Sequence, residues 1–348
     1  MRLASRPNRS EFSVPKNPMA HLEPILTMLS LDDRADIVVE PLTGGVSSDI
    51  LKVTSGHQVF AVKRALPKLK VAADWRVPVD RNMFEVAWLR VARAIEPNAV
   101  PEVLAHDPTT GTFAMTFLDS TEYPVWKAQL RSGEVDLTFA AVVGRVLGRL
   151  HDATAGDSSI ATRFQTDHIF QSIRLEPYLE ATARRHTIVA ERLMSLSKAT
   201  LGRKETLVHG DVSPKNILAG PSGPIFLDAE CAWYGDPAFD LAFCLNHLLL
   251  KCLWNRPAAD LFLRSFDALS VAYLAEVRWS TADEIERRAA HLLPGLFLAR
   301  VDGKSPVEYV TGEADKDLVR ATAIPLLGDP TDKLGDIRST WADRISAR

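Results

Sequence analysis

The pattern of apolar residues changes once along this chain, and that change limits the folds it can adopt. Between residues 36 and 63, runs of strand-forming residues are separated by the short turns Thr43-Gly44-Gly45 and Ser55-Gly56. Beyond residue 119, apolar residues recur mostly at three- and four-residue steps. The first pattern predicts an antiparallel meander, and the second predicts amphipathic helices. We therefore expect an α+β protein whose sheet and main helical part are segregated along the chain.

This segregation predicts two lobes preceded by a tail. Residues 1–19 carry three prolines and no apolar period, which predicts a flexible tail. Residues 20–118 form the predicted N-lobe, and residues 119–348 form the predicted C-lobe, which is mainly helical. Strands are predicted at 37–39, 50–53, 59–63, 111–118, 217–219 and 225–227, and helices over 84–94, 139–150 and from 239 to the end. Gly144 and Gly148, on one of these helices, predict close helix packing.

Composition and charge narrow the function classes. The 348 residues are 46% hydrophobic, which is enough to bury a core of ordinary size. The net charge of −3, from 41 basic and 44 acidic side chains, gives no overall positive field toward nucleic acid or anionic membranes. Three cysteines without a CxxC pair favour a reduced setting. We expect a soluble cytoplasmic protein that binds neither nucleic acid nor membrane.

The most informative segment is the run Val-His-Gly-Asp-Val-Ser-Pro-Lys-Asn at 208–216, followed by Asp228. Asp211 and Asn216 have the spacing of a kinase catalytic loop, in which the aspartate accepts the substrate hydroxyl proton and the asparagine holds Mg²⁺. Asp228 supplies a second hard oxygen ligand for the metal. A polar turn with a strand-end carboxylate would explain each residue alone but not the joint pattern. The segment predicts phosphoryl transfer from ATP with the help of Mg²⁺.

A lysine and a glutamate upstream fit the same chemistry. Lys63 ends a predicted strand, and Glu85 lies on the helix that follows. An ion pair between them would hold the lysine against the α- and β-phosphates of a nucleotide. Alone, Lys63 would more simply be a strand lysine that faces solvent, and its order along the chain with the 208–216 loop and Asp228 favours the functional interpretation.

Together these residues resemble the aminoglycoside phosphotransferase and choline kinase superfamily, whose members are small-molecule kinases with a protein-kinase-like fold. The resemblance extends over residues 36–250 and includes His209-Gly210-Asp211, Asn216, Asp228 and the run 235–242. It implies that Asp211 is the catalytic base and that Asn216 and Asp228 hold the metal. It also implies that His209 and Asp240 support the loop, with Asp240 bracing it through backbone amides.

A narrower resemblance connects the chain to the 5-methylthioribose kinases. It rests on residues 44–47, on 62–67, on the stretch from Trp75 through Arg81 to Glu85, and on Asp228-Ala229-Glu230. In that group both carboxylates of the last motif share the metal, so the resemblance makes Glu230 another candidate ligand. Strand alternation would place residues 228 and 230 on one face. A solvated strand-end carboxylate is the alternative for Glu230.

Two further sets of residues are candidates for the site. Gly44, Gly45 and Ser47 would cradle nucleotide phosphates, although two glycines between strands also suit a plain hairpin. The second set follows a leucine-rich helix, where charged side chains would contact a polar substrate or simply end the helix in solvent. Its members are Arg300, Asp302 and Lys304.

The predicted function is an ATP- and magnesium-dependent O-phosphotransferase that acts on a small hydroxylated metabolite such as a sugar, polyol or amino alcohol. An aminoglycoside phosphotransferase is one alternative, and a catalytically inactive nucleotide-binding regulator is another. A hydrolase using His209 and Asp211 would need further metal-ligating side chains at ligand spacing. The presence of Lys63 and Glu85 together with the catalytic-loop residues favours an active kinase.

Overall fold

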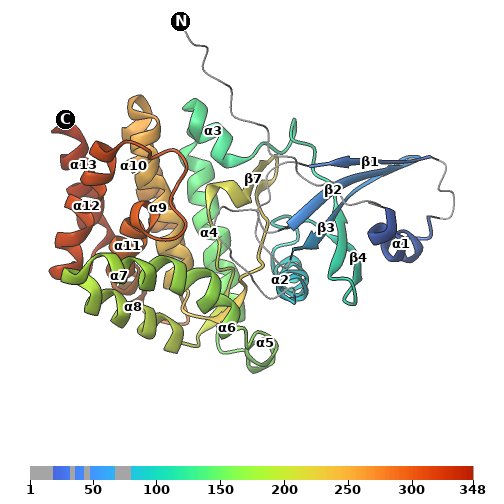
Figure 1. The fold of residues 1–348 in the computed structure, drawn as a ribbon, viewed down its shortest axis with the longest axis horizontal. Coiled ribbons are helices and arrows are strands. Elements are labelled where there is room, and N and C mark those ends of the chain that lie inside the picture. Colours follow the sequence, from blue (N-terminus) through green and yellow to red (C-terminus); the bar gives the residue numbers. More distant parts are fainter. Residues whose placement is uncertain (1–18, 32–35, 43–47, 67–79, 348) are drawn as a thin grey trace, which may run out of the picture.

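The computed structural model describes residues 19–31, 36–42, 48–66 and 80–347. Its first part is a five-stranded antiparallel sheet in the order β1-β2-β3-β5-β4. The strands are β1 (Ile37–Pro41), β2 (Ser48–Ser55), β3 (Gln58–Ala65), β4 (Val103–Asp107) and β5 (Thr112–Thr116). The helix α2 (Arg81–Ile95) lies between β3 and β4 in sequence, and α1 (Met19–Met28) precedes the sheet. Figure 1 shows this sheet at one end of the molecule and the helices of the second part at the other.

Strand alternation gives β3 two different faces. Phe60 and Val62 pack with α1 and with β2 and β5 in a small apolar cluster. Ala61 belongs to the main core together with residues of α2. Because alternate side chains of a strand share a face, Lys63 lies on the face of Ala61, toward α2. Lys63 is also central in the sheet, since it pairs with Ile50 of β2 and Phe113 of β5.

The second part is mainly helical and contains most of the core. Its long helices are α4 (Leu137–Thr154), α8 (Ala190–Gly202), α9 (Ala238–Trp254), α10 (Ala259–Leu274), α11 (Ala282–Asp302), α12 (Glu313–Gly328) and α13 (Leu334–Ser346). Shorter ones are α3 (Trp126–Ser132), α5 (Ser158–Arg163), α6 (Asp167–Phe170), the wide helix η1 (Gln171–Glu180), α7 (Ala181–Arg185) and the 3-10 turns η2 (Thr187–Val189), η3 (Pro214–Asn216) and η4 (Arg256–Ala258). Helix α9 is buried along almost its whole length, so it forms the axis of this part.

Two pairs of short strands interrupt the helices near the first part. β6 (Thr206–Val208) pairs with β9 (Trp233–Gly235), and β7 (Ile217–Gly220) pairs with β8 (Gly223–Phe226). The segments that join these strands carry the residues of the kinase-like motif. Helix α4 and β7 lie between the sheet and the helices α7 to α13 (Figure 1), which places the motif next to the sheet.

The α+β, two-lobed fold class predicted from sequence is confirmed, and so is the antiparallel meander. Close packing at Gly144 is also confirmed, because a Cβ atom there would lie 2.1 Å from the Leu269 carbonyl oxygen of α10. The sequence analysis missed α1, β4, β6 and β9. The predicted tail ends one residue too late, because α1 begins at Met19, and residues 1–18 lie outside the described residues. The boundary at residue 118 lies between β5 and α3 and stays a prediction.

Candidate active site

One cluster of the site joins the sheet, α2 and the loop that follows β8. Lys63 Nζ on β3 lies 2.7 Å from Glu85 Oε1 on α2 and 2.5 Å from Asp228 Oδ1. Both Lys63 and Glu85 are buried, and only 3% of the Lys63 surface is exposed. Asp228 lies 165 residues after Lys63, so this ion-pair cluster connects the two parts of the chain at the motif.

Electrostatics in this cluster favour a charged lysine. Burial lowers the pKa of Lys63, but the carboxylates of Asp228 and Glu85 outweigh burial and hold that pKa above its ordinary value. Burial also acts on Asp228, and Lys63 overrides it, so the pKa of Asp228 lies well below its usual range. For Glu85 burial dominates and raises the pKa to about 7, against the attraction of Lys63. The lysine is therefore a permanent positive charge beside the motif.

Asp240, at the start of α9, holds the catalytic loop through its backbone. Its carboxylate accepts hydrogen bonds from the backbone N–H groups of His209, at 2.7 Å, and Gly210, at 2.8 Å. Gly210 has φ +80°, and a Cβ atom there would lie 2.6 Å from the Cys231 carbonyl oxygen, so the turn requires glycine. These are the backbone contacts that the family resemblance leads us to expect of Asp240.

Two histidines support this arrangement. The His209 ring packs edge-on against Trp88 at 4.7 Å, accepts from the Asp211 N–H through Nδ1, and lies 3.1 Å from the Leu227 carbonyl oxygen through Nε2. Burial lowers the pKa of His209, which favours the neutral ring that these contacts need. His151 of α4 lies between the Tyr273 hydroxyl and Asp240, at 2.8 and 3.3 Å. Neither histidine is arranged as a nucleophile.

One oxygen of the Asp211 carboxylate is held by a hydrogen bond and two ion pairs. Asp211 Oδ2 lies 2.8 Å from Asn216 Nδ2, 2.8 Å from Arg174 Nη2 and 3.1 Å from Lys215 Nζ. Among the described residues, none donates to Oδ1. One oxygen is thus fixed and the other is left for a substrate hydroxyl.

Arg174 is a residue of the site that the sequence analysis missed. It lies on η1, donates to the Gly210 carbonyl oxygen, forms an ion pair with Asp211, and packs over the rings of Tyr178 and Phe243. Burial opposes its charge, but Asp211 outweighs burial and raises the pKa of Arg174. No local motif marks this arginine, because it lies 36 residues before the loop that it contacts.

Asn216 and Asp228 offer the oxygen atoms that a magnesium ion prefers. The Leu227 N–H donates to the Asn216 carbonyl oxygen, which brings the two residues side by side. Asn216 uses its amide N–H₂ toward Asp211, and Asp228 uses Oδ1 toward Lys63. Their other side-chain oxygens have no hydrogen-bond donor in the described part of the chain. An amide oxygen and a carboxylate oxygen fit a hard divalent cation.

The argument that placed Glu230 beside Asp228 on one strand face is wrong. Strand β8 ends at Phe226, and Asp228 has φ +68°, so the backbone turns between the two carboxylates and strand alternation does not apply. Glu230 is buried, and its Oε2 accepts from Arg81 Nε of α2 at 2.9 Å. A metal-ligand role for Glu230 stays a prediction that rests on the resemblance alone.

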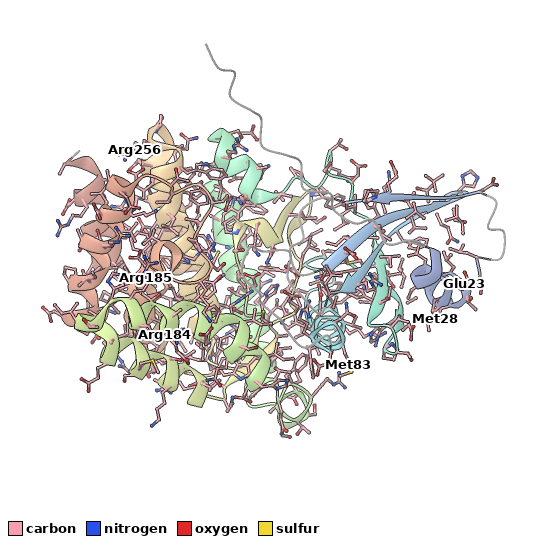
Figure 2. The ribbon with its side chains drawn as sticks, in the orientation of Figure 1. Glu23, Met28, Met83, Arg184, Arg185 and Arg256 are labelled. Atoms are coloured by element: carbon pink, nitrogen blue, oxygen red, sulfur yellow. The ribbon has the colours of Figure 1, made fainter. Side chains whose placement is uncertain are left out.

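The other predicted residues separate into three groups. Gly44, Gly45, Ser47 and Trp75 lie outside the described residues, so the phosphate-binding loop stays a prediction. Asp302 is buried against Arg320 and His186, and Arg185 of α7, labelled in Figure 2, reaches its backbone carbonyl oxygen. Lys304 pairs with Glu176 at the surface. These partners favour structural roles for Asp302 and Lys304.

Arg300 differs from its two predicted companions. It is 9% exposed, donates to the Tyr178 hydroxyl at 3.0 Å, and packs over the same ring. Tyr178 also contacts Arg174, so only one aromatic ring separates Arg300 from the partner of Asp211. Of the three predicted substrate residues, Arg300 is the one that shares a contact with Arg174, through the Tyr178 ring.

Comparison with known proteins identifies the family of the chain. A model of the phosphotransferase enzyme family matches residues 38–293. The chain is 24% identical to the methylthioribose kinase of Bacillus cereus (strain B4264) over 252 residues, and 25% identical to that of Bacillus thuringiensis (strain Al Hakam) over 252 residues. Each match covers 64% of this chain and 63% of the relative. The resemblances drawn from the sequence are confirmed.

Solved structures with a similar fold carry related names. An amicoumacin kinase, hAmiN, in complex with AMP-PNP, Ca²⁺ and Ami has a TM-score of 0.56 at 14% identity, covering 92% of this chain and 98% of that chain. A choline/ethanolamine kinase family protein from Mesorhizobium loti has a TM-score of 0.50 at 16% identity, covering 95% and 99%. At these identities the likeness is one of fold. No helix in the described ranges is long and apolar enough to cross a membrane.

Proposed function

Because the chain belongs to the phosphotransferase enzyme family, we propose that it is an ATP- and magnesium-dependent kinase. Its acceptor is the hydroxyl group of a small metabolite such as a sugar or polyol. The observation that carries this proposal is the joining of Lys63 and Glu85 through Asp228 to the loop that holds Asp211 and Asn216. A nucleotide-anchoring lysine and an oriented carboxylate are the parts that phosphoryl transfer requires.

Asp211 is the proposed base. The acceptor oxygen attacks the γ-phosphorus, the bond from that phosphorus to the β–γ bridging oxygen breaks, and the hydroxyl proton passes to Asp211 Oδ1. Arg174, Lys215 and Asn216 hold Oδ2 and thereby aim Oδ1. The products are the phosphorylated acceptor and ADP.

Lys63 and the metal residues serve the nucleotide. Lys63 contacts the α- and β-phosphates, and Glu85 holds the lysine in place. Asn216 and Asp228 would hold Mg²⁺, which would neutralise negative charge on the nucleotide phosphates. The Ca²⁺ and AMP-PNP named with the amicoumacin kinase support the use of a nucleotide and a divalent cation here.

The test is Asp211→Asn in a screen of ATP consumption across sugars, polyols, amino alcohols and aminoglycosides. The amide keeps the shape but does not accept the proton, so transfer is lost while ATP·Mg²⁺ binding measured by calorimetry persists. Asp329→Asn, at an exposed position after α12, is the matched control and keeps wild-type turnover. Near wild-type turnover in Asp211→Asn would contradict the role of Asp211.

The screen also separates the alternatives. Turnover limited to aminoglycosides would move the enzyme into that substrate class. Nucleotide binding without transfer to any compound would favour a catalytically inactive regulator.

A further inference from the structure

A second group of basic side chains lies on the same face of α9 that supports the catalytic loop. After Asp240, this face carries Phe243, His247, Lys251 and Trp254 at three- and four-residue steps, which place them in one row. Phe243 contacts Arg174, the partner of Asp211, and its ring lies 5.4 Å from that of His247. The row therefore leads away from the catalytic loop along the helix.

Lys251 is buried without a carboxylate. It is 1% exposed, and its Nζ lies 4.3 Å from the centre of the Trp254 ring and 4.1 Å from that of Tyr309. The two rings are stacked at 4.4 Å. Among the described residues, no carboxylate forms an ion pair with Lys251. A buried ammonium without a counter-ion is unfavourable, so this lysine is poised to gain one.

Basic groups from other elements face the same place. Lys127 of α3 lies 5.8 Å from the Trp254 ring and 6.0 Å from the Tyr309 ring, and Arg131 lies 5.6 Å from the Trp254 ring. The positive charge of Arg300, on α11, lowers the pKa of both Lys251 and His247. The acid that faces this group is Glu308, an exposed residue that pairs with Lys127. The balance of charge is strongly positive.

Unpartnered polar atoms occur at the same place. The Tyr309 hydroxyl and Arg300 Nε are buried and have no hydrogen-bond partner among the described residues. Burial lowers the pKa of Lys251 to about 6, Lys127 and Arg300 lower it further, and Glu308 opposes them. Burial and then the surrounding cations hold the pKa of His247 well below its ordinary value. Both residues would bind protons more tightly if an anion were bound.

We propose that the acceptor carries an acidic group, a carboxylate or a phosphate, that binds at Lys251 and Lys127 against the Trp254–Tyr309 rings while its hydroxyl reaches Asp211. This inference rests on the proposed kinase function and deepens it by naming the acceptor's charge. Phe243 and Lys251 are separated by about 12 Å along the helix, and the lysine side chain shortens that span by leaning toward the N-terminus. A small sugar acid or sugar phosphate would be attracted by this group of basic side chains, whereas a cationic acceptor would be repelled.

The first experiment measures the acceptor's charge. A pool of small hydroxylated metabolites is separated by ion exchange into cationic, neutral and anionic fractions, and each is incubated with the enzyme and γ-labelled ATP. Transfer of label to the anionic fraction supports the proposal, and gluconate and glucose 6-phosphate then distinguish carboxylate from phosphate. Label in the neutral or cationic fraction overturns it while leaving the kinase function intact. Label in no fraction counts against the kinase function.

The second experiment tests the anion site without turnover. Inorganic phosphate is titrated into the protein saturated with ADP and Mg²⁺ at pH 8, by calorimetry in two buffers of different ionisation enthalpy. We expect binding with uptake of a proton, and Lys251→Met weakens binding about tenfold and removes the uptake. Lys251→Arg retains binding without uptake. Lys198→Met, at an exposed position on α8, leaves both unchanged.

Equal binding and equal proton uptake in wild type and Lys251→Met would overturn the site. If Lys251→Met does not fold, Lys127→Ala, at a partly exposed position, provides the same test, with a loss of about threefold expected. No loss in Lys127→Ala would then count against the site.

Discussion

Lys63 and Lys251 are both almost fully buried, yet their surroundings are opposite. Lys63 lies between the carboxylates of Glu85 and Asp228, and its pKa is raised. Lys251 lies against two aromatic rings with Lys127 and Arg300 nearby, and its pKa is lowered to about 6. Burial is the same in both cases, so the neighbouring charges decide the sign of the shift.

The comparison shows which lysine has its counter-charges within the protein and which lacks them. Lys63 has its counter-charges within the protein, so it is charged before any nucleotide arrives. Lys251 has none, so its charged form depends on what binds. The same residue type thus serves as a fixed anchor in one place and as a ligand-dependent one in the other.

The largest expected effect comes from Lys63→Met. It leaves the buried Glu85 and the partly buried Asp228 without their counter-charge, which costs about 3–5 kcal/mol of unfolding free energy. The rate of transfer falls about 10³-fold because the nucleotide loses its anchor. Urea unfolding and steady-state kinetics measure the two losses, with Lys52→Met on the neighbouring strand as the matched control.

A double variant sharpens this result. Lys63→Met combined with Glu85→Gln removes one of the uncompensated charges and regains part of the stability without regaining activity. If Lys63→Met unfolds at the same urea concentration as the wild type, the contrast between the two lysines fails.

A smaller effect is expected from Glu230→Gln. If Glu230 lends its charge to the metal beside Asp228, its removal lowers kcat and kcat/KM together by about 10²-fold, by analogy with the loss of one preorganised donor. Kinetics across a Mg²⁺ series measure this loss. If Glu230 serves only as the partner of Arg81, the rate changes less than about threefold. Glu230→Gln and Arg81→Met then lower the free energy of unfolding by similar amounts.

The smallest effect, counted per pH unit, is the pH dependence of Lys251. Its pKa of about 6 in the folded protein lies below the value near 10.4 of the unfolded chain, so folding releases a proton between these limits. Wild type therefore gains stability as pH rises from 7 to 9, by about 1.4 kcal/mol per pH unit, relative to Lys251→Met. Lys63 behaves oppositely: its contribution is complete below the unfolded pKa and is lost only as pH rises above it. Urea titrations at pH 7, 8 and 9 measure the free energy of unfolding. If it changes with pH by the same amount in wild type and Lys251→Met, the prediction is contradicted.

The sequence was sufficient for the parts of the site that are local. Asp211 and Asn216 are fixed by one short loop, and Lys63 and Glu85 by one strand and the helix after it. The meander was predictable because its three strands have strong β-branched patterns and short turns. β6 and β9 were not, because three residues give too few positions to show a period.

Long-range contacts explain the rest. Arg174 meets Asp211 across 37 residues, and Tyr309 meets Lys251 across 58, so neither pair leaves a spacing that sequence reasoning can detect. Glu230 was misplaced for a different reason. The strand stops at Phe226 and the backbone reverses at Asp228, and an aspartate with positive φ gives no sequence signal of the kind that glycine gives.

The contact between α4 and α10 at Gly144 has a consequence for how this enzyme can vary. Any larger residue there would push the two helices apart, because the clash is with backbone rather than with a movable side chain. The same two helices supply His151 and Tyr273, whose hydrogen bonds lead to Asp240 and so to the catalytic loop. A position outside the candidate site is therefore expected to affect rate as well as stability. In a mutational scan scored by activity, Gly144 would rank with the catalytic residues.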